Sequence, residues 1–252
     1  MSIKSAERTL QILECVAKEK AISMRELRAN LDIPRSSLHG LLEVLVQYRF
    51  LDLSAEGEYS IGLRAFEVGY AWAQSVNLSK VAVPILRELV DQVNQTAHIG
   101  VLDGTDAVYI MKQENASAVR LISAVGKRLP AHATSLGRVL LSSLGSEDIR
   151  NRYAKDRLPQ MTGATLKTLK ELIKIVDDVR VEGFCVEKGE STPGVTGCAA
   201  PIYDRHHNLI AALSIAIIDS DPAIRDLSFY IDAAVKAAAE ISAELGAMRE
   251  KA

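Results

Sequence analysis

Residues 22–62, ISMRELRANLDIPRSSLHGLLEVLVQYRFLDLSAEGEYSIG, decide the fold of the N-terminal part of the chain. Ser23 followed three residues later by Glu26 has the spacing of a capping box, which starts a helix. The turn at residues 31–34 ends that helix, and Pro34 suits the start of the next one because a first helical turn does not use its N–H. Two short strands, 50–53 and 58–61, then flank the turn at 55–57. We therefore expect helix, turn, helix and hairpin in this order.

The second of these helices, from residue 35 to residue 47, separates an apolar face from a polar one. Its leucines recur with the helical period and form an inward stripe: Leu38, Leu41, Leu42 and Leu45. The opposite face and its flanks carry small or polar residues and one cation: Arg35, Ser36, Ser37, His39, Gly40, Glu43 and Gln47. A helix of this kind can enter a major groove, because no bulky side chain keeps its backbone away from the base edges.

Charge alone leaves a role in DNA binding undecided. Residues 1–75 hold nine lysines and arginines against ten acidic residues, a net charge of −1. An electrostatic phosphate binder is usually basic. The arginines do gather around the two helices, at positions 25, 28, 35 and 49.

Bulk composition is that of an ordinary globular protein. The chain has 252 residues, 48% of them hydrophobic and 25% charged. No apolar run reaches the ~20 residues that span a bilayer, and the charged N-terminal segment predicts an amphipathic helix instead of a signal peptide. Three widely spaced cysteines indicate neither a disulfide framework nor a zinc site. We expect a cytoplasmic protein without membrane contact, metal or cofactor.

Beyond residue 62 the pattern changes to mixed helices and strands. Before it, Ser5 is predicted to cap a first helix that ends near Lys18. We expect linker helices at 63–75 and 81–93, strands at 96–102, 107–112, 119–123, 184–187, 198–204 and 209–218, and helices at 135–144, after Ser146, at 166–181 and from Pro222 to about Gly246. Hairpin connections among the strands favour an α+β or mixed α/β domain with a largely antiparallel sheet.

Two segments of this second part could bind a ligand. In LPAHATSLG, residues 129–137, the helix that starts at Ser135 could hold an anion at its first N–H groups, or could be an ordinary helix capped by Thr134. The polar loop at 187–197 is equally compatible with ligand binding and with simple solvation. A thiol enzyme built on Cys198 with His132 or His98 is a weaker interpretation, because GCAAPIYD is typical of a buried strand. His206 and His207 lie in a predicted turn, and Phe66, Tyr70 and Trp72 have the spacing of a helix–helix interface.

With these residues in view, the chain resembles the IclR family of bacterial transcriptional regulators. The matching stretches are SAERTLQIL, IPRSSLHGLLEVL, GEYSIG, RLPAHATSLGRVLL, EGFCVEKGESTPGVTGCAAPIYD and IAALSIAI. The resemblance implies an α+β protein with an N-terminal winged helix-turn-helix (1–62), a linker helix (63–77) and a C-terminal GAF-like effector-binding domain (78–252). It also implies a homodimer or homotetramer that binds double-stranded operator DNA and responds to a small organic acid.

The resemblance assigns residues to both predicted sites. Its recognition pattern falls on Arg35, Ser36, Ser37 and His39, and Gly40 stands where relatives usually have arginine, which suggests a different operator sequence. We add two further arginines to the DNA-binding set, Arg8 and Arg25. The effector pocket maps onto Leu121, Leu129, Ser135, Leu136, Glu187, Gly197, Ser214 and Ala216, with Glu190 as the alternative to Glu187.

A binding mode and three alternatives follow from this assignment. We expect a carboxylate at the start of the Ser135 helix near Ser214, a ligand hydroxyl on Glu187, and Leu121 and Leu129 over the apolar part. Small residues at positions 197 and 216 favour a larger acid: a keto, hydroxy, sugar or aromatic acid. The protein is predicted to repress a catabolic operon. The alternatives are an activator, an enzyme built on the GAF-like domain, and an adaptor that uses the winged module without DNA.

Overall fold

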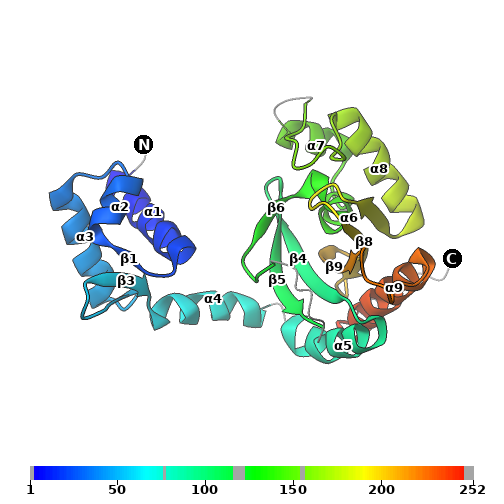
Figure 1. Ribbon diagram of the computed structural model, residues 1–252, viewed down its shortest axis with the longest axis horizontal. Helices are drawn as coiled ribbons and strands as arrows, with labels where there is room; N and C mark the ends of the chain where they lie inside the picture. Colours follow the sequence, from blue (N-terminus) through cyan, green and yellow to red (C-terminus); the bar gives the residue numbers. More distant parts are fainter. Residues whose placement is uncertain (1–2, 76–77, 116–122, 154–156, 247–252) are drawn as a thin grey trace. The chain divides into compact units, whose positions relative to one another are not determined.

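The computed structural model describes residues 3–75, 78–115, 123–153 and 157–246, which form two compact units divided after Val76 (Figure 1). The first unit contains helices and a small sheet: α1 (Lys4–Glu19), β1 (Ile22–Ser23), α2 (Met24–Asn30), α3 (Arg35–Gln47), β2 (Leu51–Leu53), β3 (Glu58–Ile61) and α4 (Leu63–Ser75). Its three strands are antiparallel in the order β1-β3-β2. Helix α4 contacts β2 and belongs to this unit.

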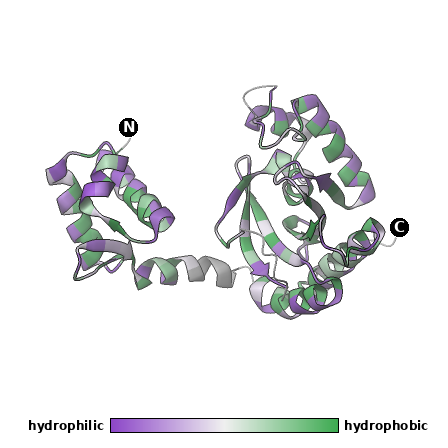
Figure 2. Cartoon of the chain, viewed as in Figure 1, coloured by the Kyte–Doolittle hydropathy of each residue, from purple (hydrophilic) through white to green (hydrophobic). Residues whose placement is uncertain are grey.

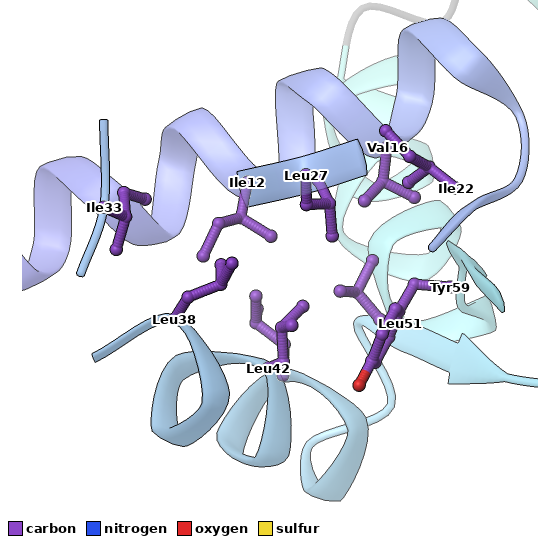
Figure 3. Packing of buried hydrophobic residues seen from close by; sticks show 10 residues of the cluster. Ile12, Val16, Ile22, Leu27, Ile33, Leu38, Leu42, Leu51 and Tyr59 are labelled. Atoms are coloured by element: carbon purple, nitrogen blue, oxygen red, sulfur yellow. The ribbon is translucent and has the colours of Figure 1, made fainter. Parts of the chain in front are cut away.

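One apolar core holds the first unit together. Helices α1, α2 and α3 direct buried side chains toward β2 and β3, and Figure 3 shows them converging from these elements. The core residues are Ile12, Val16, Ile22, Leu27, Ile33, Leu38, Leu42, Leu45, Leu51 and Tyr59. Three of the four leucines predicted on α3 are buried, and Leu41 packs against the cluster from a partly buried position.

The local signals that start α2 and α3 act as expected, whereas the predicted cap of α1 is wrong. Ser23 and Glu26 form a reciprocal capping box, and Pro34 is the residue that immediately precedes α3. Helix α1 begins at Lys4 with Ile3 before it and no side-chain cap. Ser5 lies inside the first turn, and its carbonyl accepts a hydrogen bond from Thr9 Oγ1 at 2.8 Å. Its hydroxyl is therefore two residues beyond the capping position, which is at Ile3.

The second unit is built on a six-stranded antiparallel sheet in the order β6-β5-β4-β9-β8-β7. Its elements are α5 (Leu78–Val93), β4 (Thr96–Asp103), β5 (Asp106–Gln113), β6 (Arg128–Pro130), a 3-10 turn η1 (Ala131–Ala133), α6 (Ser135–Leu141), α7 (Ser146–Arg152), α8 (Leu169–Glu182), β7 (Cys185–Lys188), β8 (Val195–Tyr203), β9 (Leu209–Ile218) and α9 (Leu227–Glu244). Within the described ranges, no helix combines the length and the apolar character that a membrane crossing needs.

Helices cover the two faces of this sheet separately. Helices α5 and α9 contact each other, and α9 packs on β8 and β9, whereas α6 contacts β4, β5, β7, β8 and β9 and also α8 (Figure 1). Figure 2 shows hydrophobic residues along the sheet and alternating hydrophobic and hydrophilic residues along α5 and α8. Because side chains alternate along a strand, each of the central strands contributes residues to both layers.

Several predicted boundaries in the second unit are wrong. The closing helix starts at Leu227 instead of Pro222, because the Asp221 side chain accepts the N–H of Ala223 at 2.9 Å and forms a local turn there. Helix α8 starts after Thr168, which forms a capping box with Glu171. Strands β1 and β6 were not expected, helix α6 ends at Leu141, and β8 begins at Val195. Residues 119–122 of the predicted strand 119–123 lie outside the described residues, and Ser123 is not in a strand.

Candidate functional site

A first candidate site lies on the outer surface of α2 and α3. A surface hollow of about 630 Å³ is lined by Met24, Arg25, Arg28, Ala29 and Arg35. Arg25, Arg35, Ser36, His39 and Gly40 are exposed, and Ser37 is partly exposed. This surface therefore combines three guanidinium groups with the small polar residues of the α3 N-terminus, which is the chemistry that phosphates and base edges require.

Two details modify the predicted DNA-binding set. Arg8 is separate from this hollow and lines another one on α1, together with Glu7, Glu14 and Asp32 among other residues. His39 Nε2 lies 3.9 Å from Glu43 Oε1 one turn further along α3, with both side chains more than half exposed. Among the described residues, no atom other than the nearby backbone of α3 lies within 4 Å of the position that a Cβ at Gly40 would take, so an alanine fits there.

A second candidate site lies on the sheet face that α6 covers. Register places Glu187 of β7 opposite Gly197 of β8, and Gly197 opposite Ala216 of β9. A Cβ at position 197 would lie 2.7 Å from Ser135 Oγ and 3.1 Å from Glu187 Oε1. Three residues from α6, β7 and β8 therefore meet at one point. Ser135 and Glu187 already occupy the space above Gly197, which changes the interpretation that this glycine makes room for a larger acid.

Glu187 is a buried acid with an altered proton affinity. Its side chain accepts hydrogen bonds from the N–H of Glu190 at 2.8 Å and from Ser191 Oγ at 3.4 Å, and the residue is 4% exposed. Burial raises its pKa to about 7, while the Glu190 N–H opposes that change. A carboxyl with this pKa can accept or donate a hydrogen bond near neutral pH.

The neighbouring acid, Glu190, has a different role. Its Oε2 lies 2.5 Å from the Arg138 guanidinium and accepts the N–H of Leu166 at 3.1 Å. Arg138 is 1% exposed and also donates from Nε to the carbonyl of His132 at 2.9 Å. Glu190 thus holds the 187–197 loop against α6, and the geometry favours Glu187 over the alternative, Glu190, as the acid beside Ser135.

The remaining predicted effector residues distribute around this point. Ser214 lies two residues from Ala216 on the same face of β9 and is 5% exposed. Leu136 touches the position that a Cβ at Gly100 would take, at 2.9 Å. Leu129 packs against the apolar cluster that contains Leu136, and Leu121 lies outside the described residues.

The start of α6 is less open to an anion than the sequence suggested. Thr134 caps the helix, and its Oγ1 accepts the N–H of Gly137 at 2.9 Å. Glu187 also lies next to Ser135, so an ionised ligand carboxylate at this position would face a second acid. The geometry therefore favours a ligand hydroxyl near Ser135.

Two buried residues of this face, His98 of β4 and Tyr109 of β5, were not assigned to the effector site from the sequence. Their rings stack with centroids 4.4 Å apart, and His98 pairs with Ser214 across β4 and β9. Burial, with a smaller contribution from Glu187, raises the pKa of Tyr109 to about 12. The apolar alternation of β4 gave no sign that His98 would share a face with Ser214, because the register between strands distant in sequence is not a local property.

The arrangement does not support the thiol-enzyme interpretation. Cys198 is fully buried and lies on the other sheet face from Gly197, toward α9, where burial raises its pKa to about 12. His132 donates from Nε2 to the Pro159 carbonyl at 2.9 Å, and burial lowers its pKa. His207 stacks on Tyr203, and among the described residues no group of three His, Cys, Asp or Glu side chains could hold a metal.

The fold and these surfaces define a DNA-binding regulator in which a winged helix-turn-helix is followed along the chain by a separate domain. Residues 5–53 match the family model of the IclR helix-turn-helix domain, and residues 70–243 match that of the bacterial transcriptional regulator IclR C-terminal domain. The chain belongs to the IclR family of transcriptional regulators. It is a transcriptional regulator and not an enzyme.

Relatives and solved structures agree over nearly the whole chain. The transcriptional regulator XynR of Escherichia coli K12 is 30% identical over 246 residues, 97% of this chain and 98% of XynR. The repressor AllR of the same organism is 33% identical over 215 residues, 84% of this chain and 79% of AllR. A crystal structure of an IclR homolog from Microbacterium hydrocarbonoxydans, complexed with 4-hydroxybenzoate, has a TM-score of 0.87 at 23% identity and covers 96% of this chain and 98% of its own.

Proposed function

We propose that this protein represses a catabolic operon and that a small organic acid, bound on the α6 face of the sheet, changes its affinity for the operator. The gathering of buried Ser135, Glu187 and Ser214 on this face carries the proposal. Two hydroxyl groups and one carboxyl group on the same face offer a polar ligand both hydrogen-bond donors and acceptors. The 4-hydroxybenzoate in the Microbacterium homolog and the name of the repressor AllR support the ligand class and the sign of regulation.

In the proposed binding mode, the ligand hydroxyl interacts with Glu187 and the carboxylate lies near Ser214. Leu129 and Leu136 pack against the apolar part of the ligand. Binding changes the relative placement of the DNA-binding units. The affinity for the operator changes as a result, by a coupling free energy of about 1–3 kcal/mol. The ligand is a keto, hydroxy, sugar or aromatic acid.

On the DNA side, the α3 N-terminus enters the major groove, with Arg35, Ser36, Ser37, His39 and Gly40 toward the bases. Arg25 and Arg8 contact the phosphate backbone. A homodimer or homotetramer supplies two such helices for one operator, and the exposed apolar residues of α4, Leu63, Phe66 and Val68, support helix packing between copies. Sedimentation of the purified protein measures the number of copies.

The test of DNA recognition uses fluorescence anisotropy with the intergenic DNA upstream of the gene. Arg35→Ala is expected to weaken binding at least tenfold, because the variant loses a cation that contacts base edges, and such a contact contributes about 1–3 kcal/mol. Effector affinity, measured by calorimetry, stays unchanged. Lys174→Ala on the exposed surface of α8 is the control, with unchanged DNA affinity. If Arg35→Ala binds the DNA as tightly as the wild type, α3 is not the recognition helix.

The direction of regulation has its own test. In vitro transcription from the same fragment should fall when protein is added and recover when the effector is present. Transcription that rises with protein would support an activator instead. A steep fall of DNA affinity with rising salt concentration would argue against the adaptor interpretation, in which the winged unit acts without DNA.

A further inference from the structure

A buried imidazole faces the proposed effector site beside Ser214. His98 of β4 is 2% exposed and pairs directly with Ser214 of β9, and residues opposite each other in antiparallel strands point to the same face. Its ring stacks on Tyr109, with the planes 18° apart. His98 is therefore fixed in position on the same face of the sheet as the predicted effector residues.

One nitrogen of this ring has a partner and the other does not. His98 Nε2 lies 2.8 Å from Ser123 Oγ. His98 Nδ1 is buried and has no hydrogen-bond partner among the described residues. A buried polar atom without a hydrogen-bond partner is destabilising. A ligand that supplies the missing hydrogen bond therefore gains binding free energy at this atom.

On this face of the sheet, the charged groups around His98 of β4 differ from those around Glu187 of β7. Lys112 and Lys127 lie close enough to His98 to lower its pKa in addition to burial, with Glu114 opposing them. Lys112 Nζ also donates to the Ser123 carbonyl at 2.6 Å, so it lies directly beside the hydroxyl that contacts the ring. At the other end, on β7, Glu187 has Glu190 and Arg138 as charged neighbours, and these two pair with each other.

The imidazole is neutral at physiological pH, because burial and Lys112 lower its pKa to about 3. A neutral ring has one N–H donor and one acceptor nitrogen. If the Ser123 hydroxyl donates to Nε2, the ring proton is on Nδ1, and that N–H is available to an acceptor on a ligand.

We propose that His98 is the carboxylate anchor of the effector site: its Nδ1–H donates to the ligand carboxylate, beside Ser214, while the ligand hydroxyl lies at Glu187. This assignment rests on the proposed function, and it defines how the ligand is oriented across the strands of the sheet. Its acid group points toward β4 and its hydroxyl toward β7. The ligand class is thereby narrowed to hydroxylated carboxylic acids.

The experiment compares two variants, each of which replaces one of the two ring nitrogens of His98 by an amide nitrogen. In His98→Asn the side-chain N–H₂ takes the place of Nδ1–H, and in His98→Gln it takes the place of Nε2. Calorimetry on the full chain uses 4-hydroxybenzoate with phenol, and gluconate with arabinitol, so that each acid is matched by an analogue without its carboxylate. Thermal melts confirm that both variants fold.

We expect His98→Gln to weaken acid binding about tenfold, to leave binding of the carboxylate-free analogue unchanged, and His98→Asn to restore most of the loss. Equal losses for acid and analogue, or no loss in His98→Gln, would overturn the anchor while the proposed function stands. If the wild type binds neither acid and neither acid changes its DNA affinity, the effector part of the proposed function fails. Benzoate, the acid without a hydroxyl, is measured as well. If benzoate binds as tightly as 4-hydroxybenzoate, the assigned direction of the ligand is wrong.

Discussion

Substitution of Gly197 by alanine tests the close approach of α6 to the sheet. The added Cβ would lie 2.7 Å from Ser135 Oγ and 3.1 Å from Glu187 Oε1, and the first distance is shorter than real Cβ contacts. Overpacking of a buried site costs about 1–3 kcal/mol. Replacing a strand glycine returns roughly 0.5–1 kcal/mol through lower chain entropy in the unfolded state. These ranges leave a net loss in free energy of unfolding of about 0–2.5 kcal/mol, with a central value of about 1–1.5 kcal/mol.

Differential scanning calorimetry of the purified protein measures this loss as a fall in Tm of about 2–6 °C. Gly163→Ala is the matched control: it lies in the same unit, and in the part of the chain that the structure describes no atom beyond its chain neighbours lies within 4 Å of the added Cβ. Combining Gly197→Ala with Ser135→Ala removes the Oγ contact, so the double variant should recover about 1 kcal/mol relative to additive behaviour. Additive single effects, or a Tm for Gly197→Ala equal to that of the control, would refute the contact between Ser135 and the sheet.

Two further predictions concern an acid and a glycine. The pKa of Glu187 is raised from 4.5 to about 7, so the folded state holds this proton more tightly than the unfolded state; the resulting stability is present below pH ~4.5 and is lost as the pH rises through ~7. Urea unfolding at pH 5 to 8 should show the wild type losing up to about 3 kcal/mol relative to Glu187→Gln, and parallel curves would show that the pKa of Glu187 is not raised in the folded state. Gly40→Ala should raise the free energy of unfolding by about 0.5–1 kcal/mol, since the added Cβ meets nothing within 4 Å and alanine favours a helix. A lower Tm in this variant would contradict the exposed helical position of Gly40.

The DNA-binding unit could be predicted from sequence because its signals are local. The Ser23–Glu26 capping box, the leucine stripe of α3 and the turn between β2 and β3 each depend on residues within a few positions of one another. Two predicted helix starts, those of α1 and α9, are wrong because other local interactions determine where these helices begin. Helix α1 begins two residues earlier than a helix capped by Ser5 would, and the turn formed by Asp221 makes α9 begin later than predicted.

The effector site depends on contacts that periodicity does not encode. Ser135, Glu187 and Gly197 were assigned through resemblance to a family, and only the register of β7, β8 and β9 explains why they meet. Arg138 of α6 is buried and paired with Glu190, 52 residues further along the chain, so no local pattern predicts this contact. His98 was considered only as part of an enzyme, because its cross-strand partner, Ser214, is distant in sequence.

Calorimetry with 4-hydroxybenzoate and gluconate on the wild type and on Ser214→Phe tests the central claim most directly. Ser214 is buried on the α6 face, so the phenyl ring would fill the space proposed for the ligand carboxylate. The account predicts that the wild type binds at least one of these acids and that Ser214→Phe binds it at least tenfold more weakly, while both bind operator DNA equally well without ligand. Equal acid affinity in the two proteins would contradict the placement of the effector on this face.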